Sequence, residues 1–248
     1  MCKGGIIMLT IKPTENLTGL TVSGDYWDLD DIIHAIYEVI GEEKRYFHYE
    51  GVRQRLLSFC LKMRQASKGE HQIDFVPNGM NKETKKKMNA IIPERNIYYG
   101  VNFLLPELVF AALALNDFIS LYKQTINNSE WSIAVTSVRK FQALVADAIA
   151  SFMTKEHYVA FLTRLHTKSP LFHQYATQYV DILNLEYLSL SKEERAAHIT
   201  SFAFRFLTED ETYKVLIQQL LGVTSISKQS FHEVELTFKY PEEDTIVW

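Results

Sequence analysis

The stretch SGDYWDLDDIIHAIYE, residues 23–38, carries the pattern that decides the fold. Just before it, Leu20 and Val22 alternate with polar residues, which is typical of a half-buried strand. From Leu29 onward, apolar residues recur at the three-to-four-residue spacing of an amphipathic helix, and Gly41 supplies a stop. The sequence therefore predicts a strand that runs almost directly into a helix.

The remainder of the chain places β patterns towards both ends and helical patterns between them. Residues 9–23 predict a hairpin, residues 71–76 a short strand with Ile73 and Phe75 facing inward, and residues 233–248 a returning hairpin. We expect an α+β fold in which a predominantly helical bundle packs against a small sheet formed by the N- and C-terminal hairpins. The expected helices cover about Glu50–Gln65, Leu108–Tyr122, Trp131–Phe152, Lys155–His166 and Pro170–Leu188, and two more follow the capping-box patterns Ser191-x-x-Glu194 and Thr208-x-x-Glu211, the second ending at Gly222.

Length and composition favour one folded domain. The chain has 248 residues, of which 47% are hydrophobic, and its 10 glycines and 6 prolines leave no room for a long flexible linker. We expect residues 1–248 to form a single domain. An alternative division has two lobes, about 1–100 mixed α/β and about 101–225 a helical bundle, followed by a returning β-hairpin at 226–248.

The net charge and the number of cysteines limit the binding partners and the cellular location that we expect for this protein. The net charge of −4 gives no electrostatic reason to expect binding to nucleic acid or to an anionic membrane. The two cysteines, Cys2 and Cys60, suggest no disulfide framework, so we expect a soluble protein of the cytoplasm. The apolar run 103–122 contains the charged residues Glu107 and Asp117, so it predicts a buried core helix rather than a membrane span.

The first residues pose a separate question. The codons for Lys-Gly-Gly at positions 3–5 can form a purine-rich run that resembles a bacterial ribosome-binding site, and Met8 follows closely. The sequence leaves open whether Met1 or Met8 is the initiator, and our hypothesis is Met8. Cys60 would then be the sole cysteine.

The aspartates of the opening stretch fit the start of a helix. Asp28 is expected to be the N-cap, because its side chain can accept from backbone donors two or three residues on. Asp30 and Asp31 then lie in the first turn, where negative charge is favoured. Trp27 and Ile32 occupy the two positions of a hydrophobic staple. Stability alone therefore explains most of this segment.

A functional interpretation of the same segment remains as an alternative. Asp30, His34 and Glu38 are four residues apart and share one helix face, and carboxylate with imidazole is a metal-ligand combination. We therefore keep Asp25, Asp28, Asp30 and His34 as candidate catalytic residues of a carboxylate-based hydrolase, with a divalent metal as one variant. A second helix with matching ligands is not apparent, so we assign no metal site and no cofactor.

A polar pair interrupts the most apolar expected helix. Asn116 and Asp117 require partners if they are buried, because an isolated buried carboxylate is costly. If the next helix returns antiparallel about the Asn127-Asn128 turn, Arg139 and Lys140 come within about one turn of Asp117. The sequence therefore predicts a structural polar network of Asn116, Asp117, Arg139 and Lys140.

The remaining groups of polar residues are weaker indications of function. Lys85, Lys86 and Lys87 lie near Tyr98 and Tyr99, and such a pattern can contact single-stranded nucleic acid, but a solvated helix face is the better interpretation. The eight histidines are scattered, and no phosphate-binding loop, nucleophile elbow or dinucleotide fingerprint is present in the sequence.

Four short runs are similar to a known set of sequences. Together they resemble a family of uncharacterised bacterial proteins of unknown function. This resemblance implies a bacterial cytoplasmic protein and carries over no activity, cofactor or catalytic residue. The runs are residues 17–28 (LTGLTVSGDYWD), 49–53 (YEGVR), 75–80 (FVPNGM) and 98–102 (YYGVN).

The sequence alone leaves the biochemical activity unassigned, and whether the chain is an enzyme stays open. Abundant aromatic residues, the lack of a catalytic signature and the apolar end at Ile246-Val247-Trp248 favour a non-enzymatic protein that acts through a surface, as a partner-binding or regulatory module. Its partner would be an unidentified protein or a second copy of the chain. The alternative is the carboxylate-based hydrolase described above.

Overall fold

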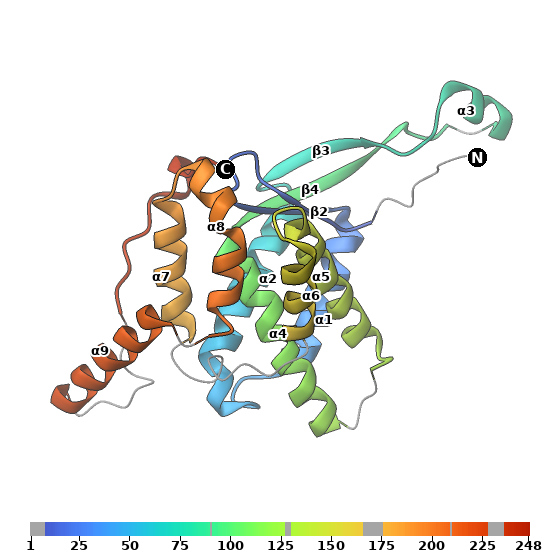
Figure 1. Cartoon of the computed structure of the whole chain (residues 1–248). Helices are drawn as coiled ribbons and strands as arrows, with labels where there is room; N and C mark the ends of the chain where they lie inside the picture. Colours follow the sequence, from blue (N-terminus) through green and yellow to red (C-terminus); the bar gives the residue numbers. More distant parts are fainter. Residues whose placement is uncertain (1–7, 90, 127–129, 166–175, 209, 228–235) are drawn as a thin grey trace.

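The computed structural model confirms an α+β fold in which helices dominate (Figure 1). Its four-stranded antiparallel sheet has the order β1-β2-β4-β3. The structure describes residues 8–89, 91–126, 130–165, 176–208, 210–227 and 236–248. The strands are β1 (Thr10–Pro13), β2 (Gly19–Gly24), β3 (Gln72–Pro77) and β4 (Arg95–Leu104). The helices are α1 (Tyr26–Ile40), α2 (Glu50–Ser67), α3 (Lys82–Met88), α4 (Leu105–Ile126), α5 (Ile133–Ala150), α6 (Lys155–Arg164), α7 (Ala176–Leu188), α8 (Lys192–Arg205) and α9 (Glu211–Ser227), with short 3-10 turns η1 (Phe47–Tyr49) and η3 (Glu243–Thr245).

The first hairpin and the helix after it are as expected. β1 pairs with β2, and β2 pairs in turn with the long strand β4, so that Leu20 lies opposite Phe103 and Val22 opposite Val101. These apolar residues are buried beneath the sheet, where α1, α2, α4 and α5 cover them. Gly19 is required in β2, because a Cβ at that position would lie 1.8 Å from the Phe103 carbonyl oxygen.

Helix α4 is the core element of the bundle. From Leu108 to Leu115 every side chain is buried, and α1, α5, α7 and α8 surround the helix. By length and composition the segment Leu105–Gln124 could cross a membrane, but 83% of its most apolar window is buried within the fold. The expectation of a buried core helix is therefore confirmed.

The prediction that the C-terminal residues add strands to the sheet is wrong for the described residues 236–248, which contain no strand. Instead of pairing with a strand, this segment lies across the helices, where side chains of other elements hold it. Asn16 Nδ2 donates to the Trp248 carbonyl (2.8 Å), and Thr18 Oγ1 donates to the Val247 carbonyl (2.6 Å). The other expected residues of this hairpin, 233–235, lie outside the described part of the chain.

The sheet instead obtains its third and fourth strands from the middle of the chain. β3 and the first half of β4 form a two-stranded ribbon that extends away from the helices and carries α3 near its end (Figure 1). We call the described residues 72–89 and 91–97 the arm. Ile73 and Phe75 are 47% and 61% exposed, so the prediction that they face inward is wrong. Among the described residues, β3 packs mainly on β4, so both side chains stay largely exposed.

The later helices largely follow the expected boundaries. The Ser191–Glu194 capping box at the start of α8 is confirmed. At α9 the side chain that caps the first turn is Asp210, which accepts from the Tyr213 backbone N–H (2.8 Å), rather than Thr208. The helix also continues beyond Gly222 to Ser227. Both differences are shifts of a boundary, not of an element.

Candidate ligand-binding site

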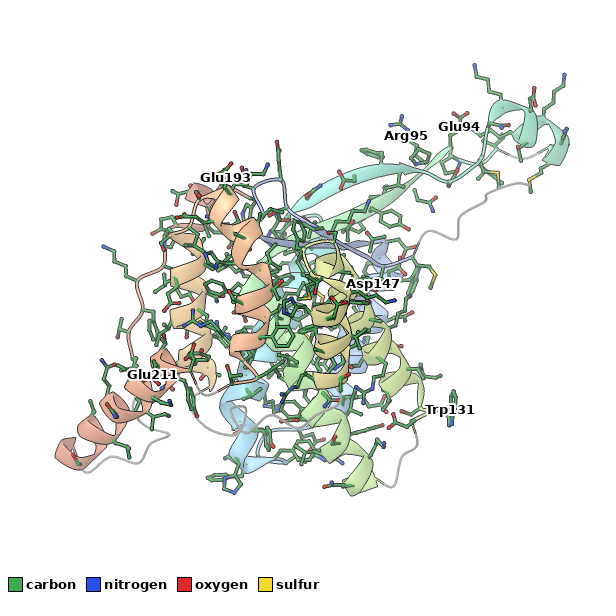
Figure 2. All side chains as sticks on the ribbon, viewed as in Figure 1. Glu94, Arg95, Trp131, Asp147, Glu193 and Glu211 are labelled. Carbon is green, nitrogen blue, oxygen red and sulfur yellow. The ribbon has the colours of Figure 1, made fainter. Side chains whose placement is uncertain are left out.

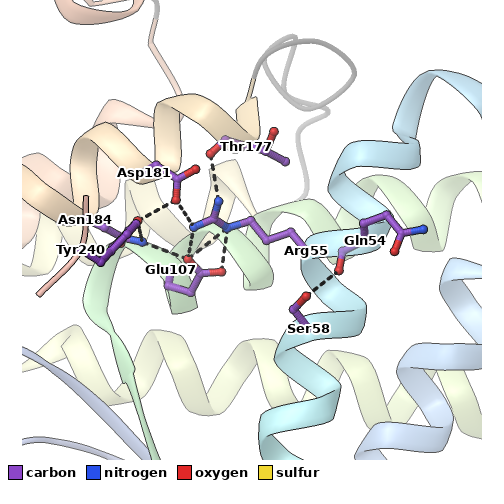
Figure 3. Close-up of polar contacts among 8 residues, drawn as sticks. All are labelled: Gln54, Arg55, Ser58, Glu107, Thr177, Asp181, Asn184 and Tyr240. Atoms are coloured by element: carbon purple, nitrogen blue, oxygen red, sulfur yellow. Dashed lines mark hydrogen bonds and ion pairs between the residues drawn. The ribbon is translucent and has the colours of Figure 1, made fainter. Parts of the chain in front are cut away.

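A cleft of about 520 Å³ opens where α2, the junction of β4 and α4, helix α7 and the C-terminal segment meet. Its walls are mainly apolar, and the rings of Phe59 and Phe103 pack together with centroids 4.2 Å apart. A small set of polar side chains lies at one side of it (Figure 3). The principal lining residues are Arg55, Phe59, Phe103, Glu107, Asp181, Asn184, Tyr240 and Trp248.

Arg55 is the centre of the polar group. Its Nε and Nη2 donate to the two carboxylate oxygens of Glu107 at 2.8 and 2.5 Å, in a bidentate pair. Nη2 also donates to Asp181 Oδ1 (2.9 Å), and Nη1 donates to the Thr177 carbonyl (3.0 Å). One guanidinium from α2 therefore links α4 and α7. We call Arg55, Glu107, Asp181, Asn184 and Tyr240 the Arg55 cluster.

Tyr240 and Asn184 complete the cluster. Tyr240 Oη donates to Asp181 Oδ1 (2.6 Å), so that the C-terminal segment is fixed to α7. Asn184 Nδ2 donates both to Glu107 Oε2 (3.0 Å) and to Tyr240 Oη (3.1 Å). Asn184 is only 2% exposed, and its Oδ1 has no hydrogen-bond partner among the described residues. A buried amide oxygen without a partner is uncommon and calls for an explanation.

The charges in the cluster are strongly coupled. Burial would raise the pKa of Glu107, but the charge and hydrogen bonds of Arg55, with the amide of Asn184, outweigh burial and hold the pKa below its ordinary value. Burial would lower the pKa of Arg55, yet Glu107 and Asp181 together raise it well above its ordinary value. Burial and the bond to Asp181 raise the pKa of Tyr240. Near neutral pH, therefore, Arg55 and Glu107 are charged and Tyr240 is a neutral donor.

At the edge of the cleft, Lys62 of α2 pairs with Glu243 of the C-terminal segment at 3.2 Å. Both side chains are about half exposed, so the pair contributes little to stability. Ser58 lies beside Arg55 on the same helix, but its hydroxyl donates to the Gln54 carbonyl (3.2 Å) rather than to a base. The arrangement is suited to holding a molecule, and the hydroxyl is not positioned as a nucleophile.

This site was not predicted from the sequence. On α2, polar residues that face the cleft recur at helical spacing as Gln54, Arg55, Ser58 and Lys62, opposite the buried face of Val52, Leu56 and Met63. This stripe of polar residues could have indicated a binding face in the sequence, although an ordinary solvent-exposed helix face shows the same pattern. Its acidic partners lie 52 and 126 residues further along the chain, and nothing local connects them.

The structure corrects the expected start of α1. The N-cap is Asp25, not Asp28: the Asp28 backbone N–H donates to Asp25 Oδ1 (2.9 Å), and Asp28 Oδ2 accepts from the Asp25 N–H (3.2 Å). The helix begins one turn early because the strand ends at Gly24 and a reciprocal capping box can form immediately. Trp27 is 68% exposed and packs edge-to-face on Tyr26, so the hydrophobic staple with Ile32 is wrong.

The remaining candidate catalytic residues lie at the surface. Asp30 Oδ1 and His34 Nε2 are 3.5 Å apart on the exposed side of α1, and the His34 side chain is 66% exposed. Within the described residues there is no group of three or more His, Cys, Asp or Glu side chains arranged to hold a metal. Burial, with the neighbouring charge of Asp25, raises the pKa of Asp28, although the hydrogen bond that it accepts from the Asp25 N–H acts in the opposite direction.

The expected polar network between α4 and α5 has a different centre. Arg139 Nη1 donates to Asn116 Oδ1 (2.8 Å) and to Gln142 Oε1 (3.0 Å), and Gln142 Nε2 donates to the Ala112 carbonyl (2.6 Å). Asp117 is 1% exposed, beside Asn116. Lys140 is exposed, and its charge acts on Asp28 at the start of α1. Gln142 is thus the member that sequence spacing missed.

The lysine patch lies on α3, near the end of the arm. Lys85 pairs with Glu94 at 3.1 Å, and no side chain of α3 is buried. Figure 2 shows Glu94 and Arg95 on the ribbon beside α3, outside the helical bundle. The interpretation of the lysines as a solvated helix face agrees with this exposure.

Comparison with known proteins defines the family. Residues 9–248 match the family model described as a domain of unknown function (DUF6904). The chain therefore belongs to that family, which agrees with the resemblance to proteins without a known function. No curated protein and no solved structure matches the chain.

Proposed function

We propose that this protein binds a small molecule in the cleft beside the Arg55 cluster and acts by binding rather than by catalysis. The observation that carries the proposal is the cleft itself, about 520 Å³ with mainly apolar walls and a few convergent polar groups. Small-molecule sites have this composition and size. The unpartnered Oδ1 of Asn184 supplies a buried acceptor in the same wall.

The chain contains a convenient reporter. It has three tryptophans, of which Trp248 lines the cleft, while Trp27 and Trp131 are 68% and 87% exposed. Figure 2 shows Trp131 at the far side of the molecule from the C-terminal segment. The double variant Trp27→Phe with Trp131→Phe therefore isolates the fluorescence of Trp248.

A screen of chemically diverse fragments on this double variant tests the proposal. We expect binders that shift Trp248 emission and raise the unfolding temperature, since a ligand of the folded state stabilises it. Replacing Asn184 with Leu should weaken these binders about tenfold or more. If no fragment at millimolar concentration affects either signal, or if Asn184→Leu leaves every affinity unchanged, the proposal is wrong.

A second candidate function rests on a different region. The arm exposes Phe75 and Ile97, 61% and 46% exposed, on paired positions of adjacent strands. An isolated two-stranded ribbon is marginally stable in water, and an exposed apolar face of this kind commonly marks an interface. We propose a second copy of the chain as the partner, because the lysines of α3 are complementary in charge to the aspartates at the start of α1.

The oligomeric state tests this second candidate. Sedimentation at increasing protein concentration should show a dimer that high salt weakens and that Phe75→Asp dissociates. The matched control is Val159→Asp, which places the same charge at a 53% exposed apolar position on α6 and should leave the dimer intact. A monomer at every concentration would rule out the second copy.

A further inference from the structure

The Arg55 cluster has more hydrogen-bond acceptors and negative charge than its own donors satisfy. Of the five N–H groups of Arg55, all but one on Nη1 have acceptors, and the Tyr240 hydroxyl proton is directed at Asp181. Asn184 Oδ1 and Asp181 Oδ2 accept no hydrogen bond from the described residues. Of these two oxygens, Asn184 Oδ1 is buried without a partner, whereas Asp181 Oδ2 belongs to a side chain that is 20% exposed, so both are acceptors that the cluster itself does not use.

The charges of the cluster also favour a ligand that donates hydrogen bonds. Glu107 and Asp181 both contact the single cation Arg55, which leaves one net negative charge in the cluster. The next cation along the cleft, Lys62, is already paired with Glu243. An anionic ligand would find a single free N–H on Arg55 and would lie close to two carboxylates that repel it.

The rest of the cleft is apolar and aromatic. Phe59 and Phe103 form one wall, and Ile246 and Trp248 of the C-terminal segment line another. A ligand that fills the cleft therefore needs a donor-rich, positively charged head at the cluster and an apolar body towards these rings. Aromatic faces also attract a cation that lies close to them.

We propose, building on the proposed small-molecule site, that the ligand is an amine: a protonated ammonium group that donates to Asn184 Oδ1 and Asp181 Oδ2, joined to an apolar or aromatic body. The ammonium group has three donors and no acceptor, which matches the unsatisfied acceptors of the cluster. It also neutralises the excess charge of the two carboxylates. Asp181 and Asn184 are the residues that select the head group.

Matched triplets of compounds test the assignment on the Trp248 reporter variant. Each triplet shares one apolar body and differs in its head, for example 2-phenylethylammonium, 2-phenylethanol and phenylacetate. We expect the ammonium member to bind at least about tenfold more tightly than the carboxylate member, with the alcohol between them. Asp181→Asn should remove most of the preference for ammonium over alcohol and leave the affinity for the alcohol nearly unchanged.

The control is Glu242→Gln, which removes a carboxylate from the same C-terminal segment at an exposed position that does not line the cleft. It should leave the preference intact. If carboxylates bind as tightly as ammonium compounds, or if Asp181→Asn keeps the preference, the amine assignment is wrong while the small-molecule site stands. If no member of any triplet binds and the fragment screen is also empty, the site itself is refuted.

Discussion

Two polar groups of this protein look alike in composition and differ in how they are built. The start of α1 gathers Asp25, Asp28, Asp30 and His34 within ten consecutive residues, and local backbone donors and solvent satisfy them. The Arg55 cluster draws side chains from α2, α4, α7 and the C-terminal segment and pairs them mainly with one another, while Asn184 Oδ1 has no partner among the described residues. A dense motif in the sequence can thus be a helix cap, while the candidate ligand site is assembled from positions far apart.

The largest effect should come from removing the cation of the cluster. Arg55→Met leaves Glu107 and Asp181 side by side without their shared partner, and we expect unfolding free energy to fall by about 3–5 kcal/mol. Urea unfolding measures the loss. Lys62→Met is the matched control on the same helix, and its exposed pair with Glu243 should be worth about 1 kcal/mol or less.

A loss below about 1 kcal/mol for Arg55→Met would show that the cluster is not a buried, coupled unit. The double variant Arg55→Met with Glu107→Gln sharpens the result. Because the uncompensated charge of Glu107 is removed, the double variant should be less destabilised than the sum of the two single variants.

The pH dependence of stability should follow Glu107. Since its pKa in the folded protein lies below the ordinary value of 4.5, its ionised form stabilises the fold above that pH, and this contribution is lost as the pH falls through the lowered pKa. Glu107→Gln should therefore be less stable near neutral pH and lose less stability on acidification between about pH 5 and pH 3. Denaturant midpoints across this range measure the difference.

The exposed residue Glu193 on α8 provides the control for acidification. Glu193→Gln should leave the slope of stability against pH almost unchanged. A slope for Glu107→Gln as steep as that of the unmodified protein would mean that Arg55 does not hold the carboxylate in its charged form.

A moderate effect is expected at the cap of α1. Asp25→Ala removes the acceptor for the Asp28 backbone N–H and should cost about 1 kcal/mol, whereas Asp25→Ser keeps an acceptor and should cost far less. Thermal unfolding compares the two. Equal losses for Ala and Ser would indicate that Asp25 acts through its charge rather than through capping.

The parts that the sequence predicted are those set by local physics. The strand-to-helix change at Gly24, the stop at Gly41 and the Ser191 capping box all depend on neighbours within a few residues. The arm was misjudged because alternation of Ile73 and Phe75 shows that they share a face, not that anything covers it. The Arg55 cluster was missed for a related reason: the spacing of Arg55 on α2 indicates a face, and only the fold brings Glu107 and Asp181 to it.

The smallest effect on stability is expected at the start of α1. It also distinguishes that segment from the Arg55 cluster most directly. Asp30→Asn removes an exposed charge whose contact with His34 is 3.5 Å, so stability should change by no more than about 0.5 kcal/mol. The same variant should show no altered response to a panel of divalent cations in thermal shift, because the described residues offer no third ligand beside this pair. A cation that stabilises the protein and loses its effect in Asp30→Asn would instead identify the start of α1 as a metal site and favour the alternative hypothesis of a carboxylate-based hydrolase. With the expected result, the polar group that resembles a site in the sequence is a helix cap, and the search for function belongs at the Arg55 cluster.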